Sequence, residues 1–300
     1  MTSVIFLPLI FAIISPFIFG LMNVLDKFVV SHRVKNPLSF VIVAGIVNFT
    51  MGIILSIFLD WSDITIKDLF FPAIVGLIFG LEFFLYYYIL IKDDISNVVG
   101  MVYVYPIIVA LLSFLVLNER LSAIAYIGML FILLGVIFLS IKDKKIKLKM
   151  SLWMMISLIF IVALYEFFIK IATNNLPELN GIAISSICIG LAILPGLFNK
   201  KIRLGFPAEL KNLKWAVLNE SLTFLGILTT YFAMAGLPAT IVSSIAATQP
   251  LTVLILESSA NKVGIKMSIE NNFSKKIIPI LMIVIGVILL YSSEILILLK

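Results

Sequence analysis

The sequence predicts an all-α polytopic membrane protein whose ten transmembrane helices form two inverted five-helix repeats. The chain is 62% hydrophobic, with a mean hydropathy of +1.20, whereas soluble domains are about 45–50% apolar. Ten apolar segments approach or exceed the roughly 17–25 residues that a helix needs to cross the hydrocarbon. The second five segments repeat features of the first five at a nearly constant offset.

The ten apolar segments leave only short connections between them. They lie at 4–30, 38–59, 69–91, 96–117, 122–141, 151–173, 181–198, 213–235, 239–257 and 277–298. A single segment satisfies its backbone hydrogen bonds in lipid only as a helix, so we expect each one to be helical. The first is too long for the apolar core of a signal peptide and lacks a basic leading region, so we expect it to be retained.

Matched residues in the two halves indicate an internal repeat. The pairs are Lys27 and Lys170, Pro106 and Pro250, and Gly135 and Gly286, at offsets of 143, 144 and 151. An odd number of crossings in each repeat inverts the second relative to the first. Inverted repeats are typical of secondary transporters, with the substrate site near the midplane. We therefore expect repeats at 1–141 and 151–300, joined by a basic linker at 142–150.

The distribution of lysine and arginine predicts the orientation. The first, third, fifth, seventh and ninth connections hold 17 of these residues, against 3 in the other connections and the termini. Because positive loops stay in the cytoplasm, we expect a multi-pass protein of the cell membrane with both termini outside and the linker inside. The net charge of +6 belongs to these loops and gives no indication of nucleic-acid binding.

Ionisable side chains within the spans are candidates for function, since each costs on the order of 2.5–3.5 kcal/mol to insert. They are Lys27, Glu82, Glu166, Lys170 and Glu220. Asn23 and Lys27, like Glu166 and Lys170, are four residues apart and share a helix face, which suggests polar patches facing a common pathway. The alternative is that the lysines extend to the headgroups. Asp26 and Glu257 lie near segment ends and are less informative.

Glu82 is the candidate for proton coupling. It lies mid-span with no lysine within one turn, and burial disfavours the charged form of a carboxyl group. It is therefore suited to binding and releasing a proton, or to pairing with a cationic substrate. The alternative is a protonated structural carboxyl. Glu220 is nearer the start of its helix, where a carboxylate also suits the helix dipole.

Pro106 and Pro250 predict helix kinks at matching places, freeing the carbonyls of Val102 and Ala246. Such breaks are tolerated where they line a cavity, so they point to a binding site, although kinks for packing alone are the alternative. Nearby polar side chains complete the candidate set: Tyr103, Tyr105 and Gln249, with Tyr86 and Tyr231 in other segments. Tyr86 is suited either to stacking on a cation or to an interfacial belt.

The fourth and fifth segments contain Pro106, a hydrophobic run, Glu119-Arg120-Leu121, and then Gly128 and Gly135. This order and spacing resembles the signature of the EamA-like family of the drug/metabolite transporter superfamily. The resemblance implies ten helices in two repeats around a central cavity lined by helices 1, 3, 4, 6, 8 and 9. We interpret Glu119 and Arg120 as structural, with Glu119 capping the following helix.

The second half departs from this motif. Val263 stands thirteen residues after Pro250 without a Glu-Arg pair, and a polar stretch runs from Ser258 to Lys276. Strict pseudo-symmetry therefore fails between the ninth and tenth segments.

The resemblance implies a secondary transporter, an exporter or exchanger of a small organic metabolite such as an amino acid or amphipathic compound, working by alternating access. The alternative is a flippase for lipid or lipid-linked sugar. An enzyme is disfavoured, because the chain lacks the metalloprotease and serine-hydrolase motifs and has one His and one Cys. We expect no cofactor or metal. The expected partners are a small solute and membrane lipids, without nucleic acid, for a monomer or homodimer.

Overall fold

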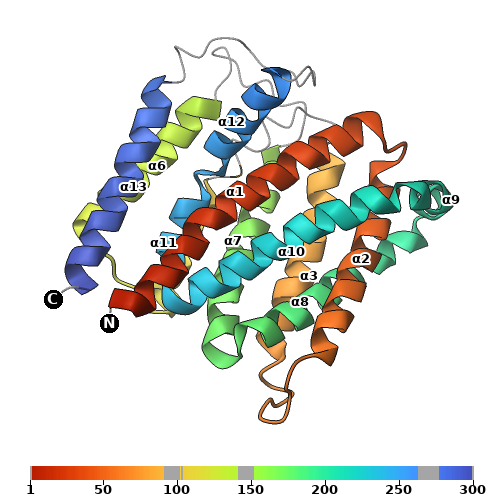
Figure 1. The fold of residues 1–300 in the computed structure, drawn as a ribbon, viewed down its shortest axis with the longest axis horizontal. Coiled ribbons are helices and arrows are strands. Elements are labelled where there is room, and N and C mark those ends of the chain that lie inside the picture. Colours follow the sequence, from red (N-terminus) through yellow and green to blue (C-terminus); the bar gives the residue numbers. More distant parts are fainter. Residues whose placement is uncertain (1, 91–101, 103, 141–151, 263–276, 299–300) are drawn as a thin grey trace.

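The computed structural model describes residues 2–90, 102, 104–140, 152–262 and 277–298, and all their regular elements are helices (Figure 1). In chain order these are α1 (Thr2–His32), α2 (Pro37–Ile57), α3 (Phe70–Leu90), α5 (Tyr105–Val116), α6 (Ala123–Ser140), α7 (Leu152–Asn175), α8 (Glu178–Ile193), the 3-10 helix η1 (Leu194–Phe198), α9 (Lys200–Glu209), the 3-10 helix η2 (Leu210–Asn212), α10 (Leu213–Gly236), α11 (Ala239–Ala246), α12 (Gln249–Lys262) and α13 (Ile277–Leu298).

Helices occupy each predicted segment as far as the structure describes it. Within the described residues, six helices are long and apolar enough to cross a membrane, and three shorter apolar ones lie at Tyr105–Val116, Ala123–Gly135 and Ile277–Leu289. The ninth segment differs from the prediction, because Ala247 and Thr248 separate it into α11 and α12. Tyr103 and the predicted linker at 142–150 lie outside the described residues.

The seventh connection, predicted as a loop, contains the short helix α9. The side chain of Asn199 caps its start by accepting from the Lys201 amide at 3.0 Å. At its end, the buried carboxylate of Glu209 accepts from the amides of Lys35 and Asn36 at 3.0 and 2.9 Å. Glu209 therefore fastens α9 to the turn between α1 and α2.

The second connection, between α2 and α3, is held by short-range hydrogen bonds. Asp68 accepts from the hydroxyl and the amide of Thr65, at 2.7 and 2.9 Å. These bonds stabilise the carboxylate and hold the pKa of Asp68 below its ordinary value.

Long helices from the two halves of the chain lie side by side. α1 packs along α10, α3 along α7 and α8, α2 along α8, and α6 along α13 (Figure 1). Glycines permit the close approaches, as small residues do at helix interfaces in membranes. A Cβ at Gly190 of α8 would lie 2.7 Å from the Gly45 oxygen of α2, and one at Gly286 of α13 would lie 2.6 Å from the Gly128 oxygen of α6.

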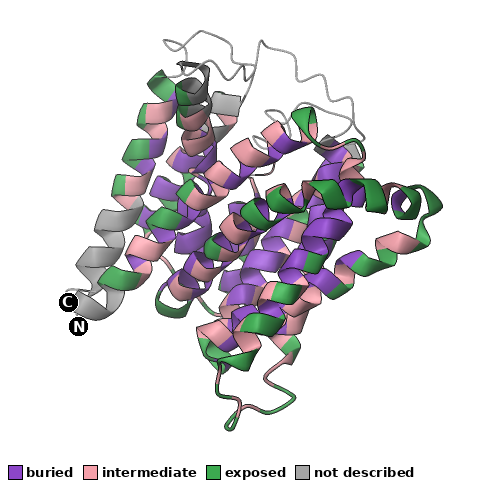
Figure 2. Cartoon of the chain, turned by 45° about the vertical axis from the view of Figure 1, so that its right-hand side comes forward, coloured by how far each residue is buried: buried purple, intermediate pink, exposed green. Residues whose placement is uncertain are grey.

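The burial pattern suits a lipid environment. Buried residues gather on the central helices, and exposed ones lie on the outer helix faces (Figure 2). Many exposed side chains are large and apolar, including Phe17, Leu115 and Ile288. Carboxyl and amide groups such as those of Glu166 and Asn48 are buried instead. Hydrocarbon accommodates the apolar exterior, while polar side chains find partners only inside the bundle.

Candidate substrate cavity

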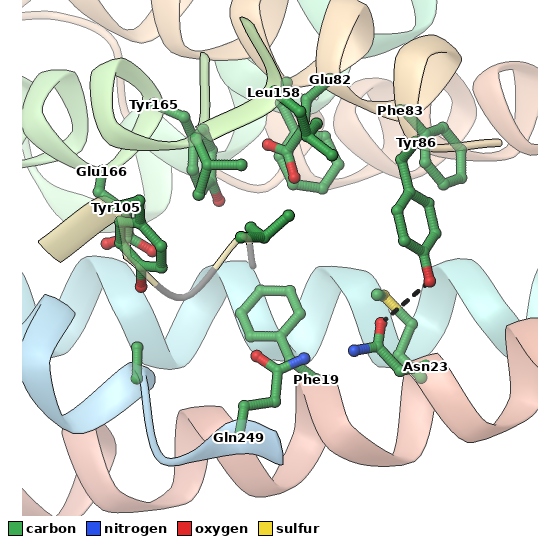
Figure 3. A pocket seen from close by; sticks show the side chains of 15 residues that line it. Phe19, Asn23, Glu82, Phe83, Tyr86, Tyr105, Leu158, Tyr165, Glu166 and Gln249 are labelled. Atoms are coloured by element: carbon green, nitrogen blue, oxygen red, sulfur yellow. Dashed lines mark hydrogen bonds between the residues drawn. The ribbon is translucent and has the colours of Figure 1, made fainter. Parts of the chain in front are cut away.

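A cavity of about 110 Å³ lies among α1, α3, α5, α7, α11 and α12 (Figure 3). Its described lining consists of Phe19, Met22, Asn23, Phe79, Glu82, Phe83, Tyr86, Val102, Tyr105, Leu158, Val162, Tyr165, Glu166, Ala246 and Gln249. A water needs roughly 10–15 Å³ of such volume, so the cavity has room for several waters or a small solute. In the numbering of the predicted segments, helices 1, 3, 4, 6 and 9 contribute.

Two helix starts place polar side chains at this cavity. Pro106 and Pro250 are each the second residue of a helix, α5 and α12. Tight i to i+3 bonds lead into both helices, from Ile107 N to Val104 O at 3.1 Å and from Leu251 N to Thr248 O at 2.9 Å. A proline has no amide proton and fits a first helical turn, so the predicted kinks are helix starts. Tyr105 and Gln249, beside the prolines, line the cavity.

Two carboxyl groups face the same space, Glu82 from α3 and Glu166 from the neighbouring helix α7 (Figure 3). One oxygen of each, Oε2, is buried without a hydrogen-bond partner, as is the hydroxyl of Tyr165. The two negative charges would repel each other. Unpartnered buried polar atoms are costly, so these three atoms are poised to bind a ligand or hold protons.

Aromatic side chains form the cavity wall around these carboxyl groups. The rings of Phe79 and Tyr165 lie 4.9 Å apart, and those of Phe79 and Phe83 lie 6.2 Å apart. The Tyr86 hydroxyl donates to Asn23 Oδ1 at 3.4 Å, which joins α3 to α1 across the cavity (Figure 3). Aromatic faces beside carboxylates form a site suited to a positively charged group.

Comparison with known proteins establishes the family. A family model, the EamA-like transporter family, matches residues 6–141. These residues belong to the EamA-like transporter family. It is also 36% identical over 112 residues to an uncharacterized protein of Methanocaldococcus jannaschii, a match covering 36% of this chain and 80% of that protein. A solved crystal structure of another protein has 15% identity and a TM-score of 0.64 over 99% of both chains, which shows a shared fold.

The EamA-like family is a family of membrane transporters. Its model therefore supports a transporter in the membrane, and the match ends at residue 141, the expected end of the first repeat.

Six of the residues that we singled out from the sequence line the cavity of this EamA-like protein. They are Asn23, Glu82, Tyr86, Tyr105, Glu166 and Gln249. Lys27, Lys170, Glu220 and Tyr231 are not among its lining residues. Helix 8 of the expected plan, which is α10, contributes none of the described lining. The buried Tyr231 hydroxyl instead makes a 2.6 Å hydrogen bond with Ser185 of α8.

Lys170 binds a helix end. Its ammonium donates to the carbonyls of Met234 and Leu237, at 2.7 and 3.0 Å, where α10 ends. This location differs from the predicted polar patch facing a common pathway, and also from the alternative of a lysine that extends to the headgroups. Glu166, one turn earlier on α7, faces the cavity and has an unpartnered oxygen. The two side chains share a helix, but Glu166 lines the cavity while Lys170 binds the end of α10.

Glu119 is structural, as expected, but it caps a different helix. Its carboxylate accepts from the Ala239 and Thr240 amides, at 3.0 and 3.3 Å, at the start of α11. Ser122 caps the following helix α6 instead, by accepting from the Ala125 amide at 3.1 Å. Glu119 therefore connects the first half of the chain to the second.

Asp26 and Glu220 lie in a second polar cluster, away from the cavity lining. Asp26 appeared uninformative in the sequence because it lies near a segment end. That expectation is wrong, because α1 continues to His32 and Asp26 is fully buried. The carboxyl group of Glu220 is buried and accepts a hydrogen bond from the Asn48 amide at 2.5 Å. This side-chain partner adds to the favourable effect of the helix dipole that we expected for Glu220.

Sequence reasoning did not propose nine of the lining residues as site residues, although it named two of them, Val102 and Ala246, as the residues whose carbonyls the prolines free. They are Phe19, Met22, Phe79, Phe83, Val102, Leu158, Val162, Tyr165 and Ala246. Most are apolar and are not distinguished by type from lipid-facing residues. Helical spacing was the available signal, since Phe19 precedes Asn23 by four residues and Val162 precedes Glu166 by four.

Proposed function

We propose that this EamA-like protein is a secondary transporter for a small organic metabolite that bears a positively charged amine, such as an amino acid or an amphipathic amine. Glu82 and Glu166 would bind the amine, and Tyr105, Tyr165 and Gln249 would contact the rest of the solute. The single observation behind this proposal is the pair of carboxyl groups with unpartnered oxygens. None of the described lining residues is basic.

Alternating access is the mechanism that we propose, with the two halves as inverted repeats. The helix contacts support this proposal because they occur in matching pairs. α1 contacts α10 as α7 contacts α3, and α1 contacts α12 as α7 contacts α5. In the numbering of the predicted segments, segment 1 contacts segments 8 and 9, and segment 6 contacts segments 3 and 4. Exchanging the two halves of the chain converts the first pair of contacts into the second. A cavity between two related halves can open to either side as they rock.

Proton coupling through Glu82 follows from its position. A solute amine and a proton would compete for this carboxyl, so solute binding on one side would release the proton there. Glu82→Gln removes the titrating group while preserving its shape. We expect the variant to fold and to lose the pH dependence of transport. An unchanged pH profile would exclude Glu82 as the proton site.

Solute release by cells is the experiment that tests the proposed function. Cells producing wild-type protein would be compared with cells producing Glu82→Gln, at matched membrane levels, by metabolite analysis of the medium. Glu178→Gln is the control, since Glu178 starts α8 and does not line the cavity. We expect an amine metabolite outside cells with wild type and Glu178→Gln but not with Glu82→Gln.

Liposome assays then determine the direction of transport and whether the protein moves a solute or a lipid. Uptake of the identified amine into proteoliposomes, with and without a pH gradient, separates exchange from export. Movement of a fluorescent lipid without movement of any amine would contradict the proposal and favour the flippase alternative.

A further inference from the structure

A second buried polar cluster joins four helices away from the cavity lining. It consists of Asp26 from α1, Asn48 from α2, Tyr87 from α3, and Asn219 and Glu220 from α10. Asn219 is 1% exposed and the other four side chains are 0% exposed. None of the five lines the cavity, and the proposed solute pathway gives them no role.

The hydrogen bonds bring the two carboxyl groups of this cluster together. Asn219 Nδ2 donates to Asp26 Oδ1 at 3.0 Å and to Glu220 Oε1 at 3.3 Å. Asn48 Nδ2 donates to Glu220 Oε2 at 2.5 Å, and the Tyr87 hydroxyl donates to Asp26 Oδ1. Both carboxyl groups therefore have an oxygen within 3.3 Å of a single nitrogen. Both amide nitrogens face carboxyl oxygens, which fixes the orientation of the two amides.

The cluster has too many acceptors. Three of its atoms are buried without a hydrogen-bond partner, namely Asp26 Oδ2, Asn48 Oδ1 and Asn219 Oδ1, and all three are oxygens. Two ionised carboxylates so close together in a buried site would repel each other strongly, and buried charges persist only when paired. What the cluster lacks is a positive charge that these oxygens can bind.

The neighbouring side chains do not remove this excess of hydrogen-bond acceptors. Lys27 follows Asp26 on α1 and has an interaction of its own, but none of the hydrogen bonds of Asp26 or Glu220 above involves it. Tyr86 is the adjacent titratable group on α3 and faces Asn23. On α10, the single proton of the Thr223 hydroxyl is shared between Met22 Sδ and the Asn219 backbone oxygen. This hydroxyl also contacts the Glu220 carboxyl group, but it brings no positive charge.

We propose that the cluster of Asp26, Asn48, Tyr87, Asn219 and Glu220 is a binding site for a small monovalent cation, a proton or Na⁺. A proton would reside on Asp26 Oδ2, because both oxygens of Glu220 and Oδ1 of Asp26 already accept hydrogen bonds. Sodium would bind at the carboxylates of Asp26 and Glu220, which both contact Asn219 Nδ2, since hard cations prefer oxygen ligands. The occupant neutralises one of the two carboxylates in either case.

The same two helices connect this cation site to the cavity. Asn23 lines the cavity and lies one turn before Asp26 on α1, while the successive residues Tyr86 and Tyr87 of α3 face the cavity and the cation site. Cation binding would therefore fix the relative positions of α1, α3 and α10 around the solute. This link rests on the proposed transport function, whereas cation binding itself does not.

The sodium arm of the test uses the purified protein without solute. Its melting temperature in detergent would be measured while NaCl replaces KCl at constant pH and ionic strength, because an organic ammonium salt would itself be a candidate solute for the cavity. If the cation is Na⁺, the wild type gains about 4 °C or more in a saturable manner, because a ligand that binds only the folded state stabilises it. Asp26→Asn and Glu220→Gln abolish this gain, and the control Glu178→Gln keeps it.

The proton arm uses infrared spectroscopy in sodium-free buffer. If the cation is a proton, the wild type shows a carboxylic acid C=O band that disappears as the pH rises. Because the cavity carboxyls can give a similar band, the spectra are compared in a Glu82→Gln/Glu166→Gln background. The band remains in that background and disappears when Asp26→Asn or Glu220→Gln is added to it. Both substitutions place an NH₂ donor where the cation would bind, so we expect them to fold.

Wild-type protein that shows neither a sodium-dependent melting temperature nor a titrating acid band overturns the proposal, even if every variant fails to fold. A sodium-dependent melting temperature or a titrating acid band that persists in both Asp26→Asn and Glu220→Gln also overturns the proposal, because the signal then arises outside this cluster. Transport has no part in either measurement. A failure here is therefore distinct from a failure of the proposed solute function, which is judged by metabolite release.

Discussion

Tyr165 is a single side chain whose buried polar group is left without a hydrogen bond by the fold. Its ring packs against Phe79 at 4.9 Å and it is 3% exposed, yet its hydroxyl has no hydrogen-bond partner. An unsatisfied buried hydroxyl costs about 1–3 kcal/mol. Phenylalanine would fill the same space without this cost, and the proposed function gives the hydroxyl a role as a contact for the solute.

Tyr165→Phe tests this interpretation. Removing an unpartnered hydroxyl should leave the melting temperature unchanged or raise it, while the lost solute contact weakens transport affinity by roughly 5–10-fold, or about 1–1.4 kcal/mol. Thermal melting and the concentration dependence of solute uptake measure the two effects. Tyr126→Phe is the control, since Tyr126 lies on the exposed face of α6. A lower melting temperature with unchanged affinity would mean that the hydroxyl is structural.

At the scale of elements, the turn between α10 and α11 is held by charges from two other segments. Lys170 of α7 binds the carbonyls at the end of α10, and Glu119, between α5 and α6, binds the amides at the start of α11. Positive charge suits a helix C-terminus and negative charge suits an N-terminus. The first half of the chain therefore helps to fix the broken ninth segment, and with it Ala246 and Gln249 of the cavity.

Glu119→Ala should destabilise the protein by about 1–2 kcal/mol, because it leaves the α11 amides without their cap. The fall in melting temperature measures this loss. Asp63→Ala in the exposed second connection is the control and should have no effect.

Lys170→Gln separates a helix-end contact from a lysine extended to the headgroups. We expect a loss of about 1 kcal/mol, because the α10 carbonyls lose a positive charge. A melting temperature equal to that of wild type would contradict the helix-end role. Lys201→Gln serves as its control, because Lys201 is exposed on α9.

At the scale of the whole molecule, α6 and α13 pack together as the last helix of each half (Figure 1). Gly135 and Gly286 both lie in this contact. A Cβ at Gly135 would lie 2.8 Å from the Pro279 oxygen, and one at Gly286 would lie 2.6 Å from the Gly128 oxygen. This contact connects the two ends of the chain and completes the proposed pairing of repeats.

Gly286→Leu should separate α6 from α13, because the clash involves backbone that cannot move aside without shifting a helix. We expect a lower melting temperature and a lower yield of folded protein. Leu281→Ala, on the exposed face of α13, should leave both nearly unchanged. Equal effects of the two substitutions would show that the glycine contact is unimportant.

The membrane orientation is a further whole-molecule prediction. In a Cys188→Ser background, an impermeant thiol reagent on intact cells should label Thr2→Cys, and should label Lys145→Cys only after the membrane is opened. The physical reason is the excess of lysine and arginine in the connections expected to be cytoplasmic. Labelling of Lys145→Cys on intact cells would reverse the orientation.

Much of the cavity was predictable because membrane insertion makes polar residues conspicuous. Glu82 and Glu166 stand out in apolar segments, and Pro106 and Pro250 mark the helix starts beside Tyr105 and Gln249. The partners of these residues were not predictable. Lys170 and Glu119 bind groups 64 and 120 residues away, and no local pattern encodes such contacts.

The sequence by itself determined the helical character, the family and the approximate course of the segments, because apolar length and residue type are properties of the linear chain. Only the tertiary structure decided which polar residues share a space. It placed Glu82 and Glu166 at one cavity and joined Asp26 to Glu220 in another cluster. Helix packing sets the distances between residues far apart in sequence, and those distances determine whether a buried carboxyl meets a solute, an amide or another carboxyl.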